Sequence, residues 1–143
     1  MIALEALFSG GYEIRYRVSL RIATILGFIG KDKKEVFENV KKLYDKRSKI
    51  VHGSGDIELS WEELYTFENY VQDCCKIFTY IKEDNMKIND VIDDSLLIKD
   101  VEDKLNQMVI NAYEAWKKTS ISNNLESLTR QSKAKMSIEM IPT

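Results

Sequence analysis

The sequence predicts an all-α fold, an antiparallel helical bundle of about five helices. Apolar residues recur at intervals of three and four along most of the chain, and no stretch alternates apolar with polar residues for long. All six glycines lie between Gly10 and Gly55, and the only proline is Pro142, so helix breakers are rare after the first third. A chain of 143 residues has the usual size of one domain and buries roughly two thirds of its unfolded surface.

Five segments carry this helical period and are separated by glycine, serine or polar stretches. In chain order they are residues 2–8, 14–29, 32–51, 60–81 and 96–118. The fourth segment has a clear start, because Ser60 and Glu63 stand at capping-box spacing. The polar stretch from Asn85 to Ser95 is predicted to be a loop, with its aspartates as loop and cap residues.

The apolar pattern divides the chain into a helical domain, residues 1–118, and a C-terminal segment, residues 119–143. Ser, Asn and Lys dominate from Thr119 onward while apolar residues thin out, so we expect a loosely held tail or a short extra helix there. The chain opens directly in an amphipathic pattern at Met1, which leaves open that it is a piece of a longer protein.

The composition is ordinary for a soluble protein, with 44% hydrophobic and 31% charged residues. No apolar run approaches 18 residues and no basic segment precedes an apolar one at the start, so we expect no membrane span, no secretory signal and a cytoplasmic location. Cys74 and Cys75 are adjacent and are interpreted as two buried thiols in a reducing compartment. With one histidine and no cysteine cluster, we expect no metal site and no cofactor.

Charge is unevenly distributed along the chain. Residues 1–53 carry 11 Lys and Arg against 6 Asp and Glu, whereas residues 54–118 carry 7 against 15. A basic first part suits a polyanionic partner, although the solvated faces of helices can also differ in sign by chance.

Arg47 and His52 are the candidate catalytic residues, and His52 is the only histidine. Histidine exchanges protons near neutral pH, and the planar arginine fork fits phosphate oxygens. Arg47 is expected on the packed side of its helix with Leu43, Tyr44 and Val51, about 140° around an ideal helix from His52. The pair would therefore converge through the turn after the helix or across a symmetry-related copy. The structural alternative is that both side chains bind the last free carbonyl groups of the helix and complement the negative end of its dipole.

The stretch Tyr44-Asp45-Lys46-Arg47-Ser48-Lys49-Ile50-Val51-His52-Gly53 resembles the HEPN domain, and within it the Apea-like branch. Two upstream segments are also similar to that branch: Ala3-Leu4-Glu5-Ala6-Leu7-Phe8 and Glu13-Ile14-Arg15-Tyr16-Arg17. The resemblance covers residues 1–53. It implies an all-α bundle that pairs into a homodimer, and a metal-independent ribonuclease that acts as a toxin or antiphage-defence effector. Arg47 and His52 match the catalytic positions, and Ser48 stands where active members often have Asn, Asp or His.

RNA cleavage fits the residue types in this stretch. The 2′-hydroxyl of RNA is a built-in nucleophile, so His52 would exchange the proton and Arg47 would stabilise the phosphate oxygens. Lys46 and Lys49 would contact the RNA backbone.

Three charged residues, Glu13, Arg17 and Arg21, are spaced by four and lie on the side of the second helix opposite its apolar residues. They form either a polar wall that supports the motif or an exposed ion-pair ladder. The expected partners are RNA, a second copy of the chain, and an antitoxin, regulatory partner or fused domain. The alternative function is a non-catalytic HEPN module that binds RNA, a nucleotide or a protein.

Overall fold

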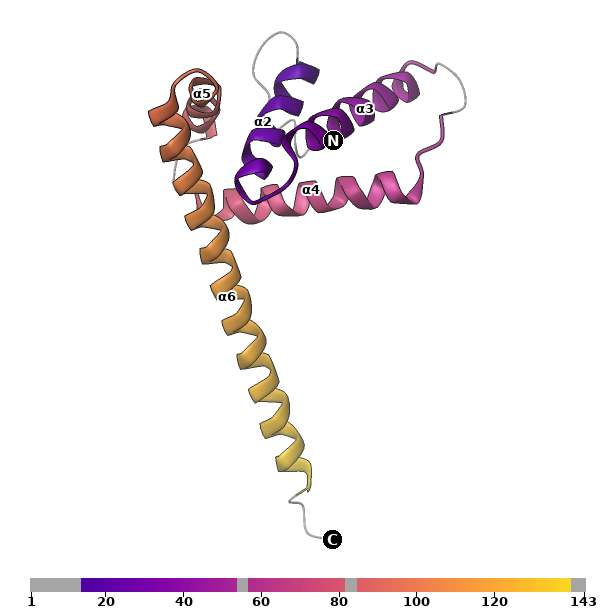
Figure 1. Ribbon diagram of the computed structural model, residues 1–143. Coiled ribbons are helices and arrows are strands. Elements are labelled where there is room, and N and C mark those ends of the chain that lie inside the picture. The colour runs from indigo at the N-terminus through magenta and orange to yellow at the C-terminus, as the bar shows by residue number, and fades with distance from the viewer. Residues whose placement is uncertain (1–13, 54–56, 82–84, 140–143) are drawn as a thin grey trace.

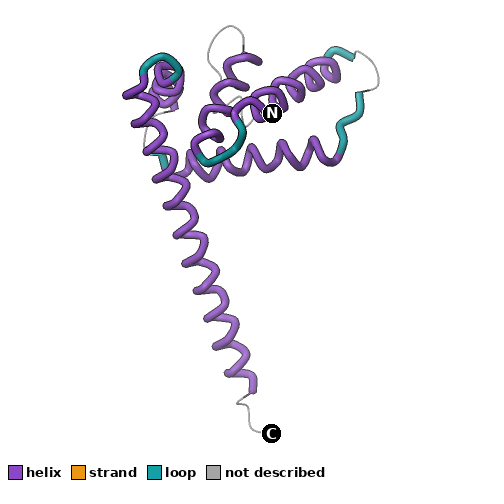
Figure 2. Tube along the Cα trace, in the orientation of Figure 1, coloured by secondary structure: helices purple, strands orange, loops and turns teal. Residues whose placement is uncertain are grey.

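The computed structural model describes residues 14–53, 57–81 and 85–139, with the side chains of residues 85, 86 and 131–139 excepted. Over these ranges the chain forms five helices and no strand (Figures 1 and 2). They are α2 (Ile14–Phe28), α3 (Lys33–Val51), α4 (Trp61–Tyr80), α5 (Asn85–Ser95) and α6 (Lys99–Glu139). The all-α prediction is confirmed. The helix expected over residues 2–8, and Glu13, lie outside the described residues.

Helices α2 and α3 form a hairpin that contributes much of the core. Val18, Ile22 and Ile25 of α2 are completely buried. The buried side chains of α3 include Val36 and Val40. The turn between the helices uses Gly30, whose φ of +94° favours glycine. Asp32 then caps α3, because its carboxylate accepts a 2.7 Å hydrogen bond from the backbone N–H of Glu35.

Helix α4 begins with the predicted capping box. The Ser60 hydroxyl accepts from the backbone N–H of Glu63, and the Glu63 carboxylate accepts from the backbone N–H of Ser60. The core face of α4 carries Tyr70, Cys74 and Ile77 and packs mainly on α6. Its first turns diverge from α3 (Figure 1).

The prediction that residues 85–95 form a loop is wrong, because they form α5. Ile88 and Ile92 lie one turn apart and are completely buried, and Val91 packs beside them, so core contacts stabilise a segment that is otherwise mostly polar. Asp93, expected to be a loop residue, forms an ion pair with Arg21 of α2. Arg21 is only 3% exposed and therefore does not belong to an exposed ion-pair ladder.

Helix α6 was expected to end near Lys118, but it continues without a break to Glu139. Its C-terminal half leaves the body of the molecule and runs past α4 (Figure 1). All side chains from 121 to 130 are exposed, so apolar residues thin out where packing ends and not where the helix ends.

The two cysteines differ in environment. Cys74 is buried but Cys75 is exposed, which corrects the expectation of two buried thiols. Neighbouring positions on a helix point about 100° apart, so only one of them faces the core. None of the helices in the described ranges is long and apolar enough to span a membrane.

Candidate functional site

Arg47 and His52 lie on the last two turns of α3. His52 is the C-cap residue, and its backbone N–H donates a 3.1 Å hydrogen bond to the carbonyl of Ser48. Gly53 follows with a φ of +68°, which ends the helix. The helix therefore uses the backbone of His52, while the residue itself is exposed at the end of α3.

The Arg47 side chain folds back over Tyr44. Its guanidinium carbon lies 5.8 Å from the centre of the Tyr44 ring, at cation–π range. Arg47 and Tyr44 are both partly buried, and Leu43 is the last buried residue of α3. The expected packing of Val51 on this side is wrong, because Val51 is 68% exposed. The end of α3 extends past the part of the helix that packs into the core.

Two ion pairs hold α3 immediately before Arg47. Asp45 pairs with Arg15 of α2, and Lys46 pairs with Glu63 of α4. The Lys46 ammonium lies 2.7 Å from both carboxylate oxygens of Glu63, and it donates a 3.2 Å hydrogen bond to the carbonyl of Glu58. Lys46, predicted to contact RNA, is thus a link between α3 and α4.

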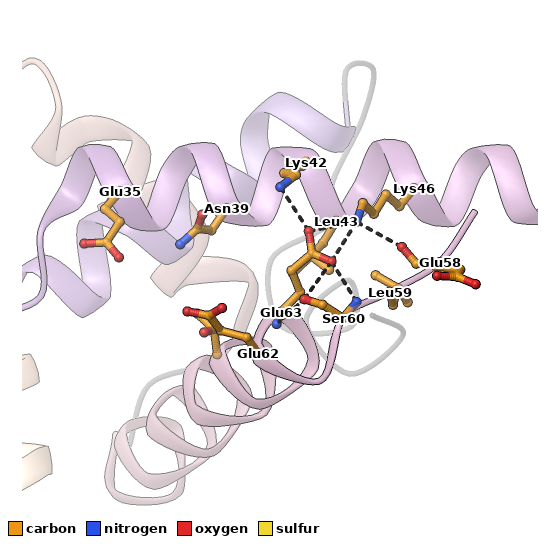
Figure 3. Close-up of a pocket in the computed structure, with 11 residues that line it drawn as sticks. Glu35, Asn39, Lys42, Leu43, Lys46, Glu58, Leu59, Ser60, Glu62 and Glu63 are labelled. Carbon is orange, nitrogen blue, oxygen red and sulfur yellow. Dashed lines mark hydrogen bonds and ion pairs between the residues drawn. The ribbon is translucent and has the colours of Figure 1, made fainter. Parts of the chain in front are cut away.

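Glu63 is the centre of a small charged network (Figure 3). Lys42 approaches the same carboxylate at 3.0 Å. The hydrogen bond from Lys46, then the backbone N–H of Ser60, then Lys42 lower the pKa of Glu63 to about 2. The carboxylate therefore stays ionised at physiological pH and offsets one of the two lysine charges.

A groove of about 670 Å³ lies between α3 and the first turns of α4, and we call it the α3–α4 groove (Figure 3). Four glutamates but only two lysines line it. Its lining residues are Glu35, Asn39, Lys42, Leu43, Lys46, Glu58, Leu59, Ser60, Glu62, Glu63 and Thr66. The surface next to the motif is consequently acidic on this side.

The structure separates the remaining predicted site residues into two places. Ser48 and Lys49 share the end of α3 with Arg47 and His52, Ser48 partly buried and Lys49 exposed. Arg17 instead acts on α5, where it helps Arg21 to lower the pKa of Asp93. Successive helical positions are 100° apart, so Arg17 lies across α2 from Arg15, which faces α3.

Three groups near the motif were not predicted as site residues: Arg15, Lys42 and Glu63. The capping-box spacing placed Glu63 in the first turn of α4, but its pairing with lysines of α3 depends on how the two helices pack. Within the described ranges, no three His, Cys, Asp or Glu side chains are grouped so that they can hold a metal ion.

Comparisons with protein families, curated proteins and solved structures find no match. The HEPN resemblance accordingly stays a prediction based on the motif and its surroundings.

Proposed function

We propose that this chain is a metal-independent endoribonuclease of HEPN type that cleaves RNA at Arg47 and His52, as a toxin or antiphage-defence effector. The observation that supports it most is the placement of the only histidine. His52 is exposed at the end of α3, within two turns of Arg47. An imidazole in this position is open to a substrate, whereas a histidine that only packed in the core would be enclosed.

The proposed reaction needs no external nucleophile. A His52 imidazole removes the proton of the RNA 2′-hydroxyl, the 2′-oxygen attacks phosphorus, and the bond to the 5′-oxygen breaks. The leaving 5′-oxygen takes a proton from a second acid, and Arg47 stabilises the negative charge on the non-bridging oxygens. The products are a 2′,3′-cyclic phosphate and a 5′-hydroxyl. DNA lacks the 2′-hydroxyl and is expected to resist.

A homodimer would supply the second acid. One chain carries one histidine, while the reaction uses a base and an acid. A two-fold axis near the end of α3 brings two copies of His52 and two of Arg47 to one phosphate. Mixing Arg47→Ala with His52→Ala protein tests this arrangement, because a mixed dimer keeps one intact Arg and one intact His on opposite chains. Partial recovery of cleavage supports it, and cleavage by a protein that stays monomeric contradicts it.

The activity itself is tested by incubating the purified chain with end-labelled RNA in EDTA. We expect fragments that end in 2′,3′-cyclic phosphate, no cleavage of DNA of the same sequence, and no cleavage by Arg47→Ala or His52→Ala. Cleavage that requires an added metal ion, or products with a free 3′-hydroxyl, would refute the proposed chemistry.

The second candidate is a non-catalytic HEPN module that binds RNA, a nucleotide or a protein such as an antitoxin. The acidic α3–α4 groove favours a protein among these partners, because its four glutamates outnumber the two lysines that would attract a polyanion. The Arg47→Ala variant separates the candidates. A module would lose no activity and keep its partner, whereas the enzyme would lose cleavage while remaining folded.

A further inference from the structure

The projecting half of α6 carries an exposed apolar stripe. Ile121, Leu125 and Leu128 are 60%, 60% and 61% exposed. They are spaced by four and three residues, so they share one face of the helix. We call these three residues the α6 stripe.

This part of α6 is a poor helix on its own. Residues 119–130 are rich in Ser, Thr and Asn, which have lower helix propensity than Ala, Leu or Lys. Isolated helices of this length are marginal in water, and most helices in proteins are stabilised by packing an apolar face. The α6 stripe is such a face, and it is not packed into the body of the molecule, because all side chains from 121 to 130 are exposed.

The projecting half is also basic. Between Lys117 and Glu139 it contains five Lys or Arg residues and two Glu. Lys117 and Lys118 lie one turn before Ile121 and flank the stripe on either side. Two such helices would repel each other if they paired directly, so charge favours an acidic partner surface.

The α3–α4 groove is an acidic surface with apolar groups at its edge. Its four glutamates, of which Glu63 binds both lysines, leave the groove with a net charge of −2. Exposed aromatic side chains lie on the first turns of α4: Tyr65, 67% exposed, lines an adjoining hollow that shares Glu35, and Trp61, 87% exposed, is the first residue of the helix. Tryptophan and tyrosine exposed to this extent are typical anchors of protein interfaces.

We infer that a second copy of this chain covers both surfaces, with the projecting half of α6 from one copy lying along the α3–α4 groove of the other. The stripe then meets Trp61 and Tyr65, and Lys118, together with Lys117 if it leaves its pair with Glu114, meets the groove glutamates. The projecting half of α6 leads away from the α3–α4 groove of its own molecule, so the contact is between copies (Figure 1). A reciprocal two-fold exchange covers both surfaces in each copy and closes the assembly at a dimer.

The chain itself favours a protein occupant of α6 over RNA. The basic residues alone would suit a phosphate backbone, but a row of Ile and Leu side chains gains stability only against another apolar surface. This inference does not depend on RNA cleavage, and the two are tested by different measurements.

Self-association of the full chain is the first test, by sedimentation equilibrium over a range of concentrations. We expect a dimer whose association constant falls at least about tenfold in Leu125→Glu, since a central apolar anchor is lost. Asn123→Glu is the matched control, because it adds the same charge on the opposite, exposed face of the same helix and should remain dimeric. Arg47→Ala should also remain dimeric, which distinguishes this interface from a dimer held at the motif.

Zero-length carbodiimide coupling of a mixed ¹⁴N and ¹⁵N sample is the second test. We expect isotopically mixed links that join Lys117 or Lys118 to Glu58 or Glu62. A chain that stays monomeric, a Leu125→Glu variant as dimeric as Asn123→Glu, or links within one copy only would overturn the inference. It would equally be overturned if the chain were monomeric and Lys118→Glu weakened RNA retention, because α6 would then be an RNA-binding arm.

Discussion

The ion pair between Arg21 and Asp93 offers the sharpest test of how α5 is held. Nε of Arg21 lies 2.8 Å from one carboxylate oxygen of Asp93, and Nη2 lies 2.6 Å from the other. The Arg21 side chain is only 4% exposed, whereas that of Asp93 is 42% exposed. Asp93→Asn therefore leaves a buried guanidinium facing a neutral amide in place of a carboxylate.

The expected loss lies between the values for buried and exposed pairs. Breaking a fully buried pair costs about 3–5 kcal/mol and an exposed pair contributes about 1 kcal/mol or less. Since water reaches the Asp93 side of the pair, we expect a loss of about 2 kcal/mol in the free energy of unfolding. For a chain of this size that corresponds to a Tm lower by about 6–8 °C.

Urea and thermal unfolding of Asp93→Asn at neutral pH measure this loss. Asp90→Asn is the matched control, because it makes the same change at an exposed position of α5 and should stay within about 0.5 kcal/mol of the parent chain.

The pH dependence gives an independent check. The hydrogen bond from Arg21 is the main cause that lowers the pKa of Asp93 in the folded chain. The stabilisation from this pair is thus complete above the ordinary aspartate pKa near 3.9 and is lost as the pH falls through the lowered value. The two proteins should converge in stability in strong acid. Equal stability at neutral pH, or a difference that persists in acid, would refute the reasoning.

Three further outcomes are expected. His52→Ala should reduce RNA cleavage at least about a hundredfold while the melting curve stays nearly unchanged, because His52 is exposed; normal cleavage by this variant would remove it from the mechanism. Glu63→Gln should increase RNA retention at low salt in a filter-binding assay, because it removes the negative charge that binds Lys42 and Lys46, whereas unchanged retention would show that these lysines lie away from the RNA path. In the folded chain a thiol reagent should modify Cys75 quickly and Cys74 only on unfolding, since burial raises the pKa of Cys74, and equal rates would contradict its burial.

Helices α2, α3 and α4 were predictable because their signals are local. A long apolar period marks α2, Asp32 caps α3, and the Ser60 and Glu63 pair starts α4. Helix α5 was missed because it has few apolar residues, and its stability comes from contacts made by Ile88 and Ile92 in the core. The end of α6 was placed too early because the apolar pattern reports packing, and a helix can continue beyond its packed part.

The candidate site was predictable only in part for a related reason. Residue types and spacing drew attention to Arg47 and His52, and the structure places both at the end of α3. The partners of Lys46 were not predictable, because Glu63 lies 17 positions later and reaches it only through the packing of α4 against α3. The same holds for Arg21, whose carboxylate partner is 72 positions away.

The end of α3 extends beyond the buried part of the helix, and this affects how firmly the candidate site is ordered. Leu43 is the last buried residue of the helix, so the turns that carry Arg47 and His52 are retained by backbone hydrogen bonds and by the ion pairs of Asp45 and Lys46. Helix ends with few apolar contacts fray locally without global unfolding. Fraying from the C-terminal end of α3 should therefore stop at Asp45 and Lys46, where the two ion pairs hold the helix. Because salt screens the exposed pair of Arg15 and Asp45, the fraction of molecules with an ordered His52 should depend on ionic strength even where overall stability does not.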